Sequence, residues 1–312
     1  MLTEHNKNVL QKLAPLIALV LISIVLTFLS PDFLTLNNIL NVMRQVSINA
    51  LIAFGMTFVI LTGGIDLSVG SILALSSVLI AGWITAGMDP VLATLLGIGV
   101  GGVMGLINGV VIYQGRVAPF IATLATMTIF RGLALVVTDG RPVTGLHSDF
   151  FSMLGGGYVA SLVPVPVIWM LVAFAVLWFV LRKTTFGRHV YAIGGNEEAS
   201  LISGVRVSQI KPAVYALSGA LSAMAGVILT SRLNSAQPNA GSGYELDAIA
   251  AVVLGGTSLA GGRGWIVGTL IGALLIGVLN NGLNLLGVSS FYQQVIKGAV
   301  ILLAVLLDRR HK

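Results

Sequence analysis

The chain has 312 residues, of which 56% are hydrophobic and only 9% are charged, and its mean hydropathy is +0.98. A soluble domain carries about 25% charged residues, so this composition excludes a soluble enzyme and a free nucleic-acid-binding protein. The excess of 17 Lys and Arg residues over 11 Asp and Glu residues instead indicates basic loops that flank a membrane. At about 20 residues for each crossing, the length accommodates roughly ten membrane helices.

Apolar runs separated by charged residues or by Gly and Pro predict about ten such helices. They cover residues 14–29, 46–62, 69–87, 91–112, 117–138, 162–181, 212–231, 247–260, 265–287 and 292–307. With the N-terminus in the cytoplasm, 12 of the 17 Lys and Arg residues fall on the cytoplasmic side, which favours an N-in, C-in topology. The predicted fold class is therefore an all-α polytopic membrane protein, with a single transmembrane domain over residues 1–312.

The first apolar run has an alternative interpretation as a secretory signal, because Lys7 and Lys12 precede it. The run is long for a signal, however, and Thr27 to Pro31 offers no cleavage site between small residues. A retained anchor is therefore the preferred prediction.

Glycine recurs at every fourth position in the fourth predicted helix, at Gly97, Gly101, Gly105 and Gly109. This spacing lets another helix approach closely, and residues 264, 268 and 272 repeat it in the ninth helix. The match to a dinucleotide-binding loop at residues 97–102 is discarded because no strand precedes it. Residues 105–109 and 277–282 resemble each other as in an inverted repeat, but chance in a glycine-rich chain explains this similarity about as well.

Charged residues inside apolar segments usually face a bundle interior or a wet cavity, because burying them in lipid is unfavourable. Asp66 follows the paired glycines 63–64, so it is a candidate for a translocation path or gate, or alternatively a cap of the next helix. Arg131 lies within the fifth helix and is a second candidate, although snorkelling to the interface would also satisfy it. Asp247 and Lys297 are expected near the outer helix ends, where an ion pair between them is a specific hypothesis.

An amide cluster of Asn280, Asn281 and Asn284 lies in the ninth predicted helix. These side chains are suited to lining a sugar path, but they are equally suited to ordinary hydrogen bonds between helices.

The loop at residues 182–211 is the most polar stretch of the chain and is predicted to be a cytoplasmic docking site. Within it, Asn196 is expected to cap a short helix with Glu197 and Glu198 in its first turn, and Gly204 to end it. The pattern of Glu198, Ala199 and Gly204 resembles the coupling motif of ATP-binding cassette permeases, in which a short cytoplasmic helix docks on an ATPase.

The resemblance extends over almost the whole chain. It is carried by VILTGGIDLSVGS at 59–71, FIATL at 120–124, YAIGGNEEA at 191–199, SAQPNAGSGYELDAIAAVVLGGTSLAGG at 235–262 and LNNGLNLLGVSS at 279–290. Through these stretches the chain is similar to the ribose permease subunits of bacterial ATP-binding cassette importers. Their fold is the permease fold shared with transporters of branched-chain amino acids.

The resemblance implies a homodimer of this chain in the bacterial inner membrane, with a cytoplasmic ATPase and a periplasmic ribose-binding protein as partners. The resemblance also implies that the binding protein selects the sugar. The chain itself has no phosphate-binding loop with Gly-Lys-Ser/Thr, so ATP with Mg²⁺ is expected on the partner ATPase only. No cofactor is expected on the chain, because its four His residues are scattered and it has no Cys.

Two other classes remain open on the sequence. An ion-coupled secondary transporter would need a buried titratable site, for which Asp66 is the candidate. A membrane enzyme would need a nucleophile and a base that converge, and the sequence offers no such pattern. Within the importer class, another monosaccharide is the alternative to ribose.

Overall fold

The computed structural model describes residues 4–160 and 162–309, so residues 1–3, 161 and 310–312 of the predicted 1–312 domain lie outside the description. Most described residues are helical, as expected in a bilayer, where a helix satisfies its backbone hydrogen bonds internally. The helices are α1 (Glu4–Leu29), α2 (Leu36–Leu61), α3 (Val69–Thr85), α4 (Pro90–Gln114), α5 (Pro119–Thr138), α6 (Asp149–Gly156), α7 (Val165–Lys183), α8 (Thr185–Gly195), α9 (Glu197–Ile202), α10 (Val207–Leu233), α11 (Tyr244–Leu254), α12 (Ile266–Leu285) and α13 (Ser290–Arg309).

Four two-residue strands join the helices at one end. They are β1 (Val143–Thr144), β2 (Tyr158–Val159), β3 (Val163–Pro164) and β4 (Ser235–Ala236). β1 pairs antiparallel with β4, with Val143 opposite Ala236, and β2 pairs antiparallel with β3.

Six described helices are long and apolar enough to cross a membrane, namely α2, α4, α5, α7, α10 and α12. Two shorter apolar helical stretches, Leu13–Leu29 of α1 and all of α3, accompany them. Large apolar side chains are exposed along α1, α4, α5 and α7, whereas the side chains of α2 and α10 are mostly buried. The chain is therefore a multi-pass membrane protein with apolar outer helices and a buried centre.

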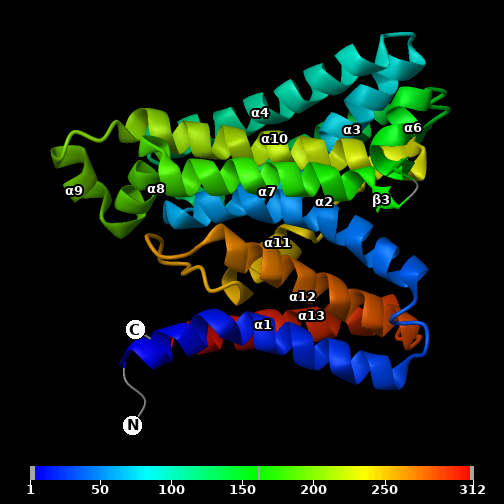
Figure 1. The fold of residues 1–312 in the computed structure, drawn as a ribbon. Helices are drawn as coiled ribbons and strands as arrows, with labels where there is room; N and C mark the ends of the chain where they lie inside the picture. The colour runs from blue at the N-terminus through cyan, green and yellow to red at the C-terminus, as the bar shows by residue number, and fades with distance from the viewer. Residues whose placement is uncertain (1–3, 161, 310–312) are drawn as a thin grey trace.

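The centre of the bundle is α10, which packs against α2, α3 and α4, and α2 also packs against α7 and α12. Figure 1 shows α8 and α9 at one end of the bundle and α6 with β3 at the other. We call these the α9 end and the α6 end. The first described turns of α1 and the last of α13 also lie at the α9 end (Figure 1).

The glycine stripe of α4 brings that helix against α10. A Cβ atom at Gly101 would overlap Ala223, one at Gly105 would overlap the carbonyl of Tyr215, and one at Gly109 would overlap Pro212. Gly97 faces Ile80 of α3 instead. In the second stripe, Gly272 packs on the backbone of α11 and Gly268 on Gly255 directly after it. Gly264 precedes α12 and does not belong to the helix.

Every predicted run contains a helix, but several predicted boundaries are wrong. α1 begins at Glu4 instead of 14, and α10 begins at Val207 instead of 212. α2 begins at Leu36 instead of 46, because Thr35 caps the helix and polar residues in its first turns find partners inside the protein. α11 ends at Leu254 instead of 260, because Gly256 has a positive φ of 85° and the chain turns there. Residues 255–265 are therefore a loop between α11 and α12.

The polar loop predicted at 182–211 is largely helical. α7 continues to Lys183, α8 and α9 follow, and α10 already starts at Val207. α8 begins at Thr185 and is capped by Thr184, whose hydroxyl accepts a hydrogen bond from the Gly187 amide.

Candidate functional site

α9 protrudes at the α9 end of the bundle (Figure 1). It combines acidic residues with exposed apolar residues. The side chain of Asn196 accepts a hydrogen bond from the Ala199 amide at 2.9 Å and caps the helix, as predicted. Glu198 and Ala199 are exposed, and Ile202 keeps 89% of its surface accessible. Leu201 beside it keeps 46%, so the protrusion carries two adjacent exposed apolar side chains next to an exposed acid.

The other two predicted residues of this motif hold the ends of α9. Glu197 forms an ion pair with Lys211 at the start of α10, so its carboxylate points back toward the bundle. Gly204 has a φ of 84°, which a residue with a side chain rarely adopts, and it lets the chain turn from α9 toward α10. Glu198 is therefore the acidic residue of α9 that remains available to a partner.

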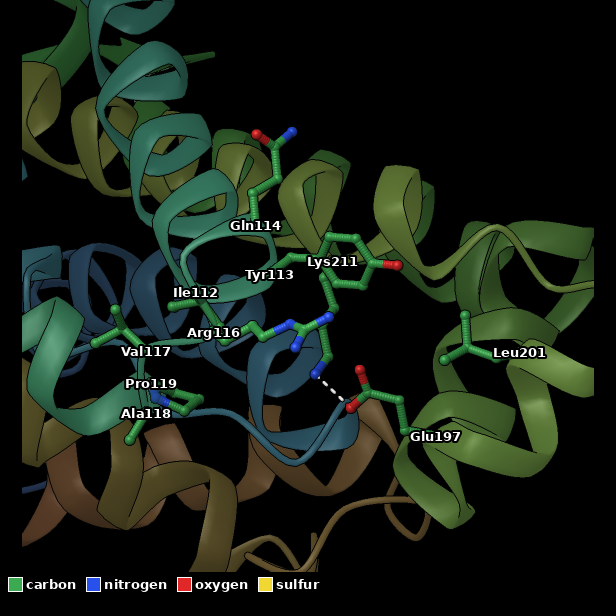
Figure 2. Close-up of a pocket in the computed structure, with 10 residues that line it drawn as sticks. All are labelled: Ile112, Tyr113, Gln114, Arg116, Val117, Ala118, Pro119, Glu197, Leu201 and Lys211. Carbon is green, nitrogen blue, oxygen red and sulfur yellow. Dashed lines mark hydrogen bonds and ion pairs between the residues drawn. The ribbon is translucent and has the colours of Figure 1, made fainter.

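A pocket of about 660 Å³ lies between α9 and the turn that joins α4 to α5. Figure 2 shows Arg116 of that turn and Lys211 of α10 on one side, and Leu201 and Glu197 of α9 on the other. The pocket is open and mixes polar with apolar residues, so a side chain from another protein would fit between α9 and the α4–α5 turn.

Glycines from three glycine pairs meet where α8 ends, and we call this contact the glycine junction. It is formed by Gly63 of the pair 63–64 and by the pairs 194–195 and 261–262. The Gly262 amide donates a hydrogen bond to the Leu61 carbonyl at 3.0 Å, and a Cβ atom at Gly194 would overlap the same carbonyl. The junction therefore places the end of α8, which leads into α9, directly on the backbone where α2 ends.

Tyr191 of α8 reinforces the glycine junction. Its hydroxyl donates a hydrogen bond to the Gly264 carbonyl at 2.8 Å, in the loop between α11 and α12. Burial raises the pKa of the Tyr191 hydroxyl, which keeps it a donor.

Asp66 lies fully buried in the break between α2 and α3. Its carboxylate accepts hydrogen bonds from the Ser68 amide at 3.0 Å, the Ser68 hydroxyl at 2.6 Å and the Ser218 hydroxyl of α10 at 3.0 Å. Asn108 of α4 donates to the Ser68 hydroxyl at 2.7 Å. Among the described residues no cation pairs with Asp66, so hydroxyl and amide donors stabilise this carboxylate.

The backbone of the same break is satisfied from two other helices. The Ile65 carbonyl accepts hydrogen bonds from the hydroxyl of Thr123 on α5 at 3.3 Å and from that of Tyr215 on α10 at 3.4 Å. Non-helical backbone at membrane depth requires such partners, so α4, α5 and α10 together hold the break between α2 and α3.

Arg131 of α5 holds a second break, between α10 and α11. Its guanidinium donates hydrogen bonds to the carbonyls of Pro238 and Ala240, both at 2.7 Å. These residues belong to the non-helical segment 237–243, which we call the re-entrant segment. At its end, Gly241 packs backbone to backbone on Gly70 in the first turn of α3.

Asp247 and Lys297 form an ion pair in the structure, with 3.0 Å between the carboxylate Oδ2 and Nζ. The Asp247 side chain keeps 7% of its surface exposed and that of Lys297 keeps 27%. The pair joins α11 to α13 one turn after the re-entrant segment.

The three asparagines of α12 face different partners and do not form one cluster. Asn281 and Asn38 of α2 exchange two amide hydrogen bonds, at 2.7 and 3.0 Å. Asn284 accepts a hydrogen bond from Gln293 of α13 at 2.8 Å. The carbonyl oxygen of Asn280 is buried and has no partner among the described residues. Asn281 and Asn284 therefore join helices, as the alternative interpretation predicts.

Sequence reasoning missed several residues of these sites. Ser218, Asn108 and Asn38 complete the polar contacts, but nothing near any of them in the sequence indicates its partner. Ile202 carries a signal that could have identified it, because it is an apolar residue in the most polar stretch of the chain.

The comparisons with known proteins agree on one family. Residues 38–305 match the family described as the permease component of the branched-chain amino acid transport system. The chain is 66% identical to the ribose import permease protein of Bacillus subtilis over 98% of this chain and 95% of that protein.

Two further relatives carry the same description. The ribose import permease protein of Haemophilus influenzae is 53% identical over 94% of this chain and 91% of its own length. That of Escherichia coli K12 is 52% identical over 95% of this chain and 92% of its own length. No solved structure matches the chain.

Proposed function

The chain belongs to this permease family, and from that premise we propose that it carries D-ribose across the bacterial inner membrane as the membrane subunit of an ATP-driven importer. A permease is the transport component and not the ATPase. The observation that carries the ribose assignment is the similarity to ribose import permeases over nearly the whole chain.

The proposed complex contains two copies of this chain, two sites for a cytoplasmic ATPase and one periplasmic ribose-binding protein. The ATPase binds ATP with Mg²⁺ and docks on α9, where exposed Glu198 and Ile202 lie beside the pocket at the α4–α5 turn. The binding protein delivers ribose at the α6 end.

The proposed topology has the α9 end in the cytoplasm, with N-in and C-in termini and ten crossings in a single domain. It is supported by the position of the first turns of α1 and the last turns of α13 at the α9 end (Figure 1). Arg182 and Lys183 lie in the last turn of α7 at the same end, as expected for cytoplasmic positive charge.

The proposed coupling runs through the glycine junction. Because Gly194 of α8 rests on the backbone at the end of α2, a shift of α9 on the ATPase would move the break that contains Asp66. This break and the re-entrant segment held by Arg131 are the proposed gate, since two interrupted helices at membrane depth are a common design of transporter sites. Asn280 remains a candidate for the path because its carbonyl oxygen has no partner among the described residues.

The deciding experiment is uptake of radiolabelled ribose into proteoliposomes that contain the permease, its ATPase and its binding protein, with and without internal ATP. The variant Glu198→Arg reverses the exposed charge of α9 and is expected to abolish both uptake and co-purification of the ATPase. Asp32→Arg is the matched control, because Asp32 is an exposed acid between α1 and α2 at the α6 end.

Two results would overturn the proposal. Uptake of ribose by the permease alone, driven by a pH gradient, would identify a secondary transporter. A complex that imports other monosaccharides with ATP but not ribose would refute the substrate assignment and leave the importer class intact.

A further inference from the structure

The re-entrant segment is non-helical backbone within a membrane protein. It follows β4, which pairs with β1 at the α6 end, and it leads to the first turn of α11. Lipid offers no hydrogen bonds, so non-helical backbone at membrane depth occurs where protein buries it or where it lines a water-filled space.

Two contacts establish how deep this segment lies. Arg131, which binds the Pro238 and Ala240 carbonyls, precedes the end of α5 at Thr138 by roughly 10 Å at 1.5 Å for each residue. Gly70, on which Gly241 packs, precedes the end of α3 at Thr85 by roughly 22 Å on the same scale. The segment therefore runs from the α6 end, where β4 pairs with β1, inward to the first turn of α3, which is the end of α3 farthest from the α6 end.

The two faces of the segment differ. Pro238 and Gly241 are buried against the bundle, whereas Gln237, Asn239 and Ser242 are exposed. Arg131 and the helix neighbours satisfy the buried face. On the exposed face, the amides of Gln237 and Asn239 form no side-chain hydrogen bond to any residue that the structure describes.

We infer that Gln237, Asn239 and Ser242 line the water-filled path of the sugar and offer hydrogen bonds to its hydroxyl groups. This inference rests on the proposed function and names the residues of its pathway. Two exposed amides and a hydroxyl are unfavourable against lipid, which supports a water-filled space opposite this face of the segment.

The chemistry of the three side chains matches a neutral sugar. Each sugar hydroxyl both donates and accepts, and an amide side chain offers both functions without a charge. Exposed, uncharged contacts hold a passing sugar weakly enough for release, which conduction requires. Arg131 keeps the segment in place through backbone carbonyls, so the amides of Gln237 and Asn239 remain available to the sugar. The Ser242 hydroxyl donates to the Asn239 carbonyl at 3.0 Å and can still accept a hydrogen bond from the sugar.

The absence of Cys from the chain provides a direct test. Single variants Gln237→Cys, Asn239→Cys and Ser242→Cys, in the reconstituted complex, are treated with a charged, membrane-impermeant methanethiosulfonate. Val176→Cys on the exposed apolar surface of α7 is the lipid-facing control, and Ser222→Cys within α10 is the buried control. Ribose uptake by each cysteine variant is measured before labelling, and it shows whether that variant has folded and assembled into the complex.

We expect the Asn239→Cys and Ser242→Cys variants to react about tenfold or more faster than both controls, because a thiol reacts as a thiolate and needs water to ionise. Ribose is expected to slow the reaction, and the label to abolish ribose uptake. Reaction no faster than in the Val176→Cys variant would overturn the inference, as would full labelling with undiminished uptake.

A second measurement separates this inference from the proposed function. The rate at which the thiol is labelled measures the exposure of these residues to water, and this measurement does not require transport. The unmodified complex could fail to import ribose while the cysteine variants of the re-entrant segment react rapidly. The assignment of ribose as substrate would then be wrong, but the conclusion that these residues face water would hold. If the complex imports ribose and the variants stay unreactive, the inference alone fails.

Discussion

Asp66 shows how one buried carboxylate joins three helices without a cation among the described residues. It receives three hydrogen bonds, two from Ser68 at the start of α3 and one from Ser218 on α10, while Asn108 of α4 binds Ser68 in turn. A buried polar network of this kind stabilises a single arrangement of its helices only while every member keeps its partner.

Removing this carboxylate should destabilise the chain. Asp66→Ala leaves the donors of Ser68 and Ser218 unpaired, and each buried unpaired group costs about 1–3 kcal/mol. The thermal unfolding midpoint of the purified permease in detergent should fall, and fall less for Asp66→Asn, which keeps an acceptor oxygen. Asp32→Ala, at an exposed acid, is the control, and an equal midpoint for Asp66→Ala and the control would contradict this prediction.

The ion pair of Asp247 and Lys297 offers a second prediction at this scale. Asp247→Lys places two cations side by side, in a position where the original carboxylate was almost fully buried. The loss of stability should be largely restored in the double variant Asp247→Lys with Lys297→Asp, with a coupling free energy of about 0.5–3 kcal/mol. Thermal unfolding of the four proteins in detergent measures the coupling, and additive effects would refute it.

Between helices, the glycine junction is a contact that tolerates no side chain at Gly194. A Cβ atom there would overlap the carbonyl of Leu61, whereas a Cβ atom at Gly195 would meet nothing within 4 Å. A side chain is therefore excluded at Gly194 and accommodated at Gly195. Comparing the two positions distinguishes the effect of the close contact from the effect of losing glycine's backbone flexibility.

We therefore expect Gly194→Ala to uncouple transport. Separating α8 from α2 should reduce ribose uptake about tenfold while the ATPase remains bound and active, because α9 itself is unchanged. Gly195→Ala, the matched control, should transport normally. Normal uptake in the Gly194→Ala complex would show that α2 does not take its position from α8.

The helices were predictable from the sequence where a long apolar run outweighs its few polar residues, as in α4, α5 and α12. The first turns of α2 were not, because they are rich in polar residues, and the partner of Asn38 there, Asn281, lies far away in the sequence on α12. For the same reason the sequence points to Asp66 and Arg131 as unusual charges but does not reveal what they bind. Their partners are single polar side chains and backbone carbonyls of distant segments.

At the scale of the whole molecule, the two ends of the bundle should lie on opposite sides of the membrane. Arg141→Cys near β1 is expected to react with an impermeant thiol reagent in intact cells whose outer membrane has been permeabilised. Ser203→Cys beside α9 should react only after the inner membrane is opened. Both positions are exposed in the structure, so access depends on the membrane. Labelling of the two variants from the same side would refute the topology.

The network around Asp66 also constrains how the chain is assembled during synthesis. Ser218 follows Asp66 by 152 residues, and at about 5–20 residues per second the ribosome needs roughly 8–30 s to produce it. Until α10 is synthesised, the Asp66 carboxylate lacks the hydrogen bond from Ser218. The Ile65 carbonyl in the break between α2 and α3 likewise lacks the hydrogen bond from the Tyr215 hydroxyl. The early helices must therefore stay in contact with water or with the insertion machinery, and a chain cut short before α10 should be a preferred target of membrane proteases.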